Sequence, residues 1–132
     1  MCYSFVLSPK CLFYVTLGGM KETYLPVDDI LAFRDKRSWK QFHNPKDLAI
    51  SLSLEASELL ECFQWSSDDL IVKEKQQQMA QELADVFIYA VQFADALGLD
   101  IPTIIKEKLQ TNEEHYAVEK TYGSSKKYTE LE

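Results

Sequence analysis

Two pairs of acidic residues lie inside apolar segments of this chain, and they constrain its fold more than any other feature. The pairs are Glu55/Glu58 and Glu82/Asp85, and within each pair the two residues are three positions apart. On an α-helix this spacing places both carboxylates on one face. A helix with such apolar flanks is mostly buried, and a buried ionised carboxylate is costly unless a positive charge accompanies it. Since few cationic side chains lie near either pair, the pattern favours a divalent cation held by oxygen ligands.

Two such helices packed antiparallel can bring all four carboxylates to one point and hold Mg²⁺ or Mn²⁺ there. A single pair of this kind arises easily in a chain with 21 acidic residues, and the alternative reading is a solvated helix face. A di-iron site needs Glu-x-x-His on each of two helices. The only histidines are His43 and His115, and the residues three positions before them are Lys40 and Asn112. The sequence therefore favours magnesium chemistry over redox iron.

The pattern of apolar residues and helix-capping signals predicts an all-α bundle of four main helices. Asn44-Pro45 is typical of a helix start, and Gly98 is typical of a helix end. The expected helices run from Val27 to just before His43, from Pro45 to about Phe63, from Lys73 to Leu97, and from Ile101 to about Tyr116. We expect a turn at residues 64–69, with Ser and Asp as caps, and little regular structure in residues 123–132.

Residues 1–19 differ in composition from the rest of the chain. They are rich in aromatic and β-branched residues, and Lys10 interrupts them, so they match neither a signal peptide nor a membrane span. We expect Met20 to be the natural start, residues 1–19 to be a non-native or disordered extension, and residues 20–132 to form a single domain.

Charge and cysteine content limit the classes of function. The net charge is −7, which argues against a nucleic acid polymer or an anionic membrane as partner. The three cysteines, Cys2, Cys11 and Cys62, lack the spacing of a metal site. Cys62 is expected to be a buried free thiol on an apolar helix. The two early cysteines do not make a disulfide framework, which favours a reducing cytoplasm.

Motifs at several separate places, in the right order, resemble the MazG-like family of all-α nucleoside triphosphate pyrophosphohydrolases. Glu-x-x-Glu is followed after 23 residues by Glu-x-x-Asp, and three further segments resemble the dCTP pyrophosphatase branch. These segments are residues 33–48, 63–65 and 126–131. The resemblance implies Mg²⁺-dependent hydrolysis of (d)NTP to (d)NMP and pyrophosphate, which cleanses the nucleotide pool. It also implies a homodimer or a dimer of dimers.

By this resemblance the metal ligands would be Glu55, Glu58, Glu82 and Asp85. One carboxylate, Glu58 or Glu61, is expected to take the proton from the attacking water, although Glu61 is equally well read as an ordinary exposed acid. The residues expected to bind substrate are Trp39, His43, Trp65 and Tyr89 for the base, and Lys108 and Asn112 for the phosphates, with Lys126 a weaker candidate. The fourth helix ends Asn112-x-x-His115-Tyr116-Ala117 where the family usually has Asn-x-x-Arg-Tyr-Pro, which puts phosphate contacts there in doubt.

Two alternatives stay open at this point. The chain can be a non-catalytic helical-bundle interaction protein whose acids are surface or interface charges. It can also be a hydrolase of modified nucleotides, because the size of the base pocket does not follow from the sequence.

Overall fold

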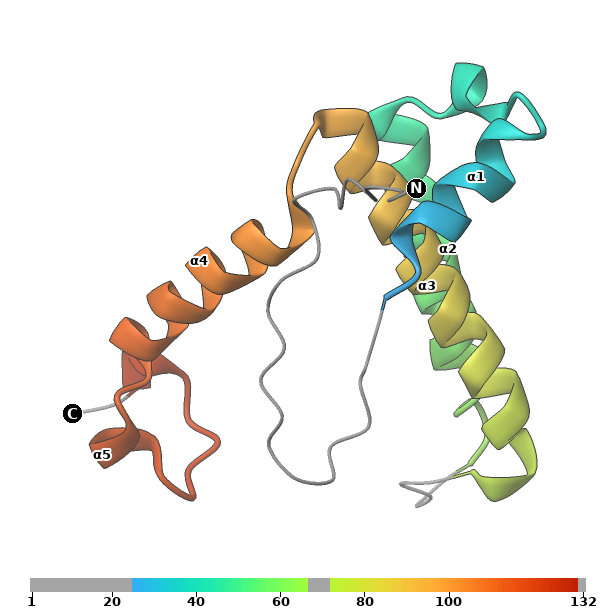
Figure 1. Ribbon diagram of the computed structural model, residues 1–132. Helices are drawn as coiled ribbons and strands as arrows, with labels where there is room; N and C mark the ends of the chain where they lie inside the picture. Colours follow the sequence, from blue (N-terminus) through green and yellow to red (C-terminus); the bar gives the residue numbers. More distant parts are fainter. Residues whose placement is uncertain (1–24, 67–71, 131–132) are drawn as a thin grey trace, which may run out of the picture.

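The chain is described by a computed structural model over residues 25–66 and 72–130 (Figure 1). The expectations for residues 1–19 and for caps at Asp68 and Asp69 lie outside this part. The described elements are the α-helices α1 (Val27–Asp35), α2 (Pro45–Glu61), α3 (Gln76–Leu97), α4 (Ile101–His115) and α5 (Val118–Thr121), and the 3₁₀ helices η1 (Trp39–Phe42), η2 (Lys73–Lys75) and η3 (Tyr128–Glu130). No strand occurs in these residues, which confirms the all-α prediction.

Local capping signals set the ends of the long helices. The Asn44 side chain accepts a 3.0 Å hydrogen bond from the Asp47 backbone N–H, and Pro45 opens α2. Gly98, with φ of 65°, ends α3 in the left-handed conformation that glycine adopts without a Cβ clash. Asp100 caps α4 in the same way as Asn44 caps α2. The boundaries predicted for these three helices hold to within about three residues.

The first helix is shorter than predicted, and this difference shapes the site. It ends at Asp35, and Ser38 has a left-handed backbone with φ of 54°. An α-helix of L-residues does not continue through that conformation, so the single helix expected up to His43 is wrong. Trp39 begins η1 instead and meets Phe33 edge-on, with ring centroids 5.9 Å apart.

Helices α2 and α3 lie side by side in opposite directions, and α1 crosses them near the C-terminal end of α3 (Figure 1). Within residues 25–66 and 72–130 the buried apolar side chains are few: Leu48, Cys62, Val72, Val91 and Ala94. Cys62 is a buried free thiol, as predicted.

A buried arginine joins α1 to α3. Arg34 is 2 % exposed, and its Nη1 donates a 2.6 Å hydrogen bond to Oδ2 of Asp95. Its Nε donates to Asp35 at 2.7 Å, and Lys40 Nζ lies 3.6 Å from the Asp95 carboxylate. Hydrogen bonding to the Arg34 guanidinium lowers the pKa of both Asp95 and Asp35. This network fixes α1 and η1 over one end of α3.

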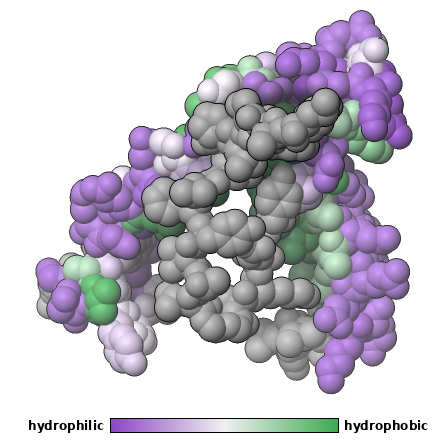
Figure 2. Space-filling view, in the orientation of Figure 1, coloured by the Kyte–Doolittle hydropathy of each residue, from purple (hydrophilic) through white to green (hydrophobic). Residues whose placement is uncertain are grey.

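Helix α4 points away from the α2–α3 pair (Figure 1). It is bent by 100° relative to the segment Lys73–Leu97, which contains η2 and α3. Its residues are exposed except for Ile101 and Asn112, which are half-buried. The outer edge of the α2–α3 pair is hydrophilic, whereas apolar residues show on the side that faces α4 (Figure 2). In the described residues no single helix is long and apolar enough to span a membrane; Lys73–Leu97 and α4 meet that test only as a bent pair, by length and composition alone.

Candidate functional site

Three carboxylates meet between the two longest helices. Glu55 comes from the middle of α2, and Glu82 and Asp85 come from α3, which runs past it in the opposite direction. One oxygen of each carboxylate lies within 4.8 Å of the others, and all three side chains are half-buried. We call these residues the carboxylate cluster. A set of converging carboxylate oxygens with room for water is the donor set that Mg²⁺ and Mn²⁺ prefer.

The cluster has no positive partner among the residues that the structure describes. No Lys, Arg or His in the ranges 25–66 and 72–130 forms a salt bridge with Glu55, Glu82 or Asp85. Burial, followed by the negative charges of Glu58, Asp85 and Glu82, raises the pKa of Glu55. The ionised cluster is therefore destabilised by itself, and a divalent cation would relieve the repulsion.

The two acids predicted as candidate bases lie outside the cluster. Glu58 is exposed, one turn along α2 from Glu55, so the structure groups three of the four predicted ligands. Glu61 is also exposed and lines a separate hollow with Ser57 and Leu60.

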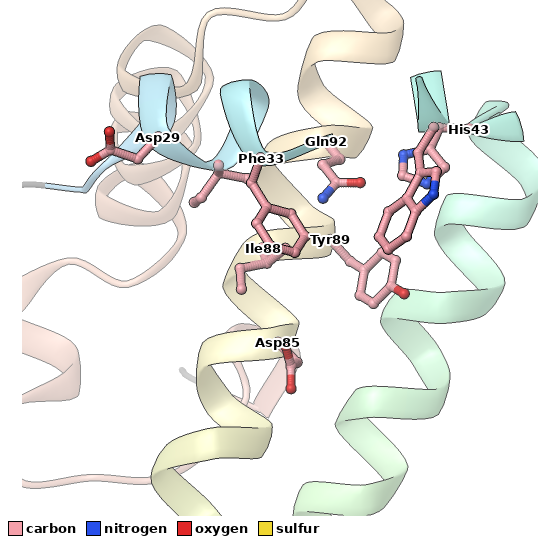
Figure 3. Close-up of a pocket in the computed structure, with 9 residues that line it drawn as sticks. Asp29, Phe33, His43, Asp85, Ile88, Tyr89 and Gln92 are labelled. Carbon is pink, nitrogen blue, oxygen red and sulfur yellow. The ribbon is translucent and has the colours of Figure 1, made fainter. Parts of the chain in front are cut away.

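A cavity of about 430 Å³ adjoins the cluster through Asp85, which belongs to both (Figure 3). Its lining residues come from α1, η1, the segment after η1, and α3: Asp29, Ile30, Phe33, Trp39, His43, Asp85, Ile88, Tyr89 and Gln92. The lining is mostly apolar and aromatic with a few polar groups, which is typical of a site for a small organic ligand.

The structure brings some of the predicted substrate-binding residues together and not others. Trp39, His43 and Tyr89 line this cavity. Trp65 is 92 % exposed in the turn after α2 and does not line it. Lys108 and Asn112 lie on α4, the helix that points away from the α2–α3 pair, and Lys126 is exposed beyond α5.

Sequence reasoning missed Phe33 and Gln92 as cavity residues. Gln92 is 4 % exposed, and its Oε1 atom is buried without a hydrogen-bond partner, as is Nδ1 of His43. A signal for Gln92 was present in the sequence, because it follows Asp85 by seven residues and therefore shares its helix face.

Comparisons with known proteins identify the family of this chain. A model of the MazG-like family matches residues 50–131. The chain is 38 % identical over 104 residues to dCTP pyrophosphatase 1 of Rattus norvegicus, covering 75 % of this chain and 61 % of that protein. It is 36 % identical over 104 residues to dCTP pyrophosphatase 1 of Homo sapiens, again covering 75 % of this chain and 61 % of that protein. The chain thus spans less than two thirds of the length of these relatives.

The fold is also found in a solved structure. The crystal structure of a pyrophosphatase from Archaeoglobus fulgidus DSM 4304 matches with a TM-score of 0.64 and 34 % identity, covering 75 % of this chain and 99 % of that one. The family match contains both acidic pairs, all of α3 and the part of α2 from residue 50 onward. The chain therefore belongs to the MazG-like family.

Proposed function

We propose that this protein is a Mg²⁺-dependent nucleoside triphosphate pyrophosphohydrolase that converts (d)NTP and water to (d)NMP and pyrophosphate. The observation that carries the proposal is the position of Asp85, which belongs both to the carboxylate cluster and to the aromatic cavity. One side chain thus joins a site suited to metal and phosphates to a site suited to a base. The relatives named dCTP pyrophosphatase support dCTP or a related deoxynucleotide as the preferred substrate.

The proposed reaction divides its work between the cluster and its neighbours. Glu55, Glu82 and Asp85 hold the metal, and Glu58 is the further ligand or takes the proton from the attacking water; Glu61 is the second candidate for that base. When bound, Mg²⁺, or Mn²⁺ in its place, neutralises triphosphate charge and lowers the pKa of bound water. Water adds to the α-phosphorus, the bond to the bridging oxygen breaks, and pyrophosphate leaves. Trp39, His43 and Tyr89 enclose the base.

The proposed assembly is a homodimer or a dimer of dimers. Large apolar side chains are exposed on all three long helices, among them Leu54 at 56 %, Phe87 at 50 % and Leu109 at 55 %. Since single chains rarely expose such extended apolar surface, a second copy is the proposed cover. In that assembly α4 of one copy can reach the carboxylates of another, which would bring Lys108 and Asn112 to the triphosphate. Light scattering coupled to size exclusion would contradict this assembly if the protein were a monomer.

The free thiol of Cys62 supports a reducing compartment, and we propose the cytoplasm.

The reaction is tested by pyrophosphate release from a panel of dNTPs and NTPs with Mg²⁺. We expect dCTP to yield dCMP and pyrophosphate, Glu58→Gln to abolish release, and Glu74→Gln, at an exposed acid of η2, to leave it unchanged. Silence across the panel with Mg²⁺ and Mn²⁺, from a folded sample, would contradict the canonical substrate class. Release confined to modified nucleotides would support hydrolysis of modified nucleotides as the alternative function. No release from either set of nucleotides would favour the non-catalytic interaction protein.

A further inference from the structure

Gln92 is a buried polar side chain whose acceptor oxygen has no partner in the described structure. The residue is 4 % exposed, and no hydrogen bond reaches its Oε1 atom. Buried polar groups in folded proteins are nearly always hydrogen-bonded, and an unpaired one destabilises the fold. Since Leu or Met would fill the same space without this penalty, the carboxamide needs an explanation outside the packing of the chain.

The position of Gln92 suggests what its oxygen meets. Asp85, Ile88, Tyr89 and Gln92 share one face of α3, and all four line the cavity. At 1.5 Å of rise per residue, Gln92 lies about 10 Å along the helix from Asp85. Figure 3 shows Asp85 at one end of the cavity and the Gln92 carboxamide at the other, with Ile88 and Tyr89 between them. The carboxylate cluster therefore marks the phosphate end, and Gln92 marks the opposite end.

We propose that Gln92 is a specificity-determining residue that reads the edge of the nucleobase and selects bases with an exocyclic amino group. This inference rests on the proposed function, which places the phosphates at the Asp85 end. A base held between the aromatic side chains then turns its far edge toward Gln92. The amino groups of cytosine and adenine are donors, whereas uracil and thymine carry a carbonyl oxygen at the equivalent position. On binding, the Gln92 carboxamide turns so that Oε1, buried without a partner in the structure, accepts from the amino group and meets a carbonyl oxygen unfavourably.

Nδ1 of His43 is a second buried, unpartnered polar atom on the same cavity. His43 lines the cavity from the segment after η1, whereas Gln92 lines it from α3 (Figure 3). Two residues that line one cavity thus each carry a buried polar atom without a partner, and a polar ligand edge could satisfy both, whereas an apolar ligand would leave both unpaired.

The test measures base discrimination without requiring catalysis. The dissociation constants of dCMP and dUMP are measured by calorimetry in EDTA for the wild-type protein, for Gln92→Met and for Gln77→Met. Methionine keeps the length of the side chain and removes the carboxamide. Gln77 is an exposed glutamine of the same helix, so its variant controls for the change in composition.

We expect the wild-type protein to bind dCMP at least about tenfold more tightly than dUMP, the factor that corresponds to about 1.4 kcal/mol. Gln92→Met should bring this ratio close to one, while Gln77→Met leaves it unchanged. Gln92→Met should also raise the Tm of the unliganded protein, because it removes an unpaired buried acceptor. A glutamine with a purely structural role would lower the Tm on substitution and leave the ratio intact, and that result would overturn the proposal.

The kcat/KM values for dCTP and dUTP separate this inference from the proposed function. Pyrophosphate release with a dCTP/dUTP ratio that Gln92→Met does not change would overturn the role of Gln92 alone. A dCMP/dUMP binding ratio that depends on Gln92, with no pyrophosphate release from any nucleotide, would support base reading and overturn the proposed reaction.

Discussion

Helix α3 carries two groups of partly buried carboxylates that differ in how their charge is balanced. Asp95 lies near its C-terminal end and pairs with the buried Arg34, which lowers the pKa of Asp95. Glu82 and Asp85 lie near its middle and face Glu55, whose pKa is raised by burial and by its acidic neighbours. The first group is complete within the chain and joins α1 to α3. The second has no cation among the described residues, which indicates a ligand rather than a structural role.

The largest expected effect comes from removing one charge of the carboxylate cluster. Glu82→Gln should lower kcat/KM for the proposed nucleotide substrate by about 10²–10³-fold, because it removes a ligand of the metal that would neutralise phosphate charge in the transition state. The same substitution should leave the protein in EDTA as stable as the wild type or more stable, since it relieves repulsion. Steady-state kinetics and urea unfolding of the same sample measure both effects. Unchanged kinetics would place Glu82 outside the site.

Substitution in the Arg34–Asp95 ion pair should instead lower the stability of the fold. Arg34→Met should destabilise the fold by about 3 kcal/mol, because it leaves Asp95 partly buried without its charged partner. Lys36→Met, at an exposed cation next to α1, should change stability by less than about 0.5 kcal/mol. Urea unfolding in EDTA measures both values. Equal stability of the two variants would show that the Arg34 network does not hold α1 against α3.

The smallest expected effect is a difference in pH dependence between the two groups. Glu55 has a raised pKa, so its favourable contribution is present below its ordinary pKa and is lost as the pH rises through the raised value. Asp95 has a lowered pKa, so its contribution is present above its ordinary pKa and is lost as the pH falls through the lowered value.

Urea unfolding from pH 3 to pH 7 in EDTA, over the range in which carboxyl groups titrate, separates these contributions. Glu55→Gln should remove the loss of stability at the upper end of this range, and Asp95→Asn should weaken the loss at the lower end. If Glu55→Gln changed only the acid side, the pKa of Glu55 would be shifted in the opposite direction.

Much of the fold follows from local signals in the sequence. Asn44, Pro45 and Gly98 act within a few residues of themselves, so the ends of α2 and α3 are predictable from neighbouring residues. The grouping of Glu55 with Glu82 and Asp85 is also predictable, because it needs only two antiparallel helices and the spacing of the acids.

The missed features depend on how distant segments meet. The left-handed backbone at Ser38 ends α1, and a serine within a helical pattern does not predict this conformation. The burial of Gln92 depends on α1 and η1 lying over α3, and nothing in its own neighbourhood requires it. The position of α4 also depends on distant contacts, since most of its residues are exposed within the described part of the chain.

The assignment of the carboxylate cluster as a divalent-cation site is tested by the thermal unfolding of the wild type and of Glu82→Gln, each in Mg²⁺ and in EDTA. Mg²⁺ should raise the Tm of the wild type, by the equivalent of about 2.7 kcal/mol at a hundredfold excess over its dissociation constant. The rise for Glu82→Gln should be much smaller. No rise in the wild type, or equal rises in both proteins, would contradict the assignment of this cluster as a divalent-cation site.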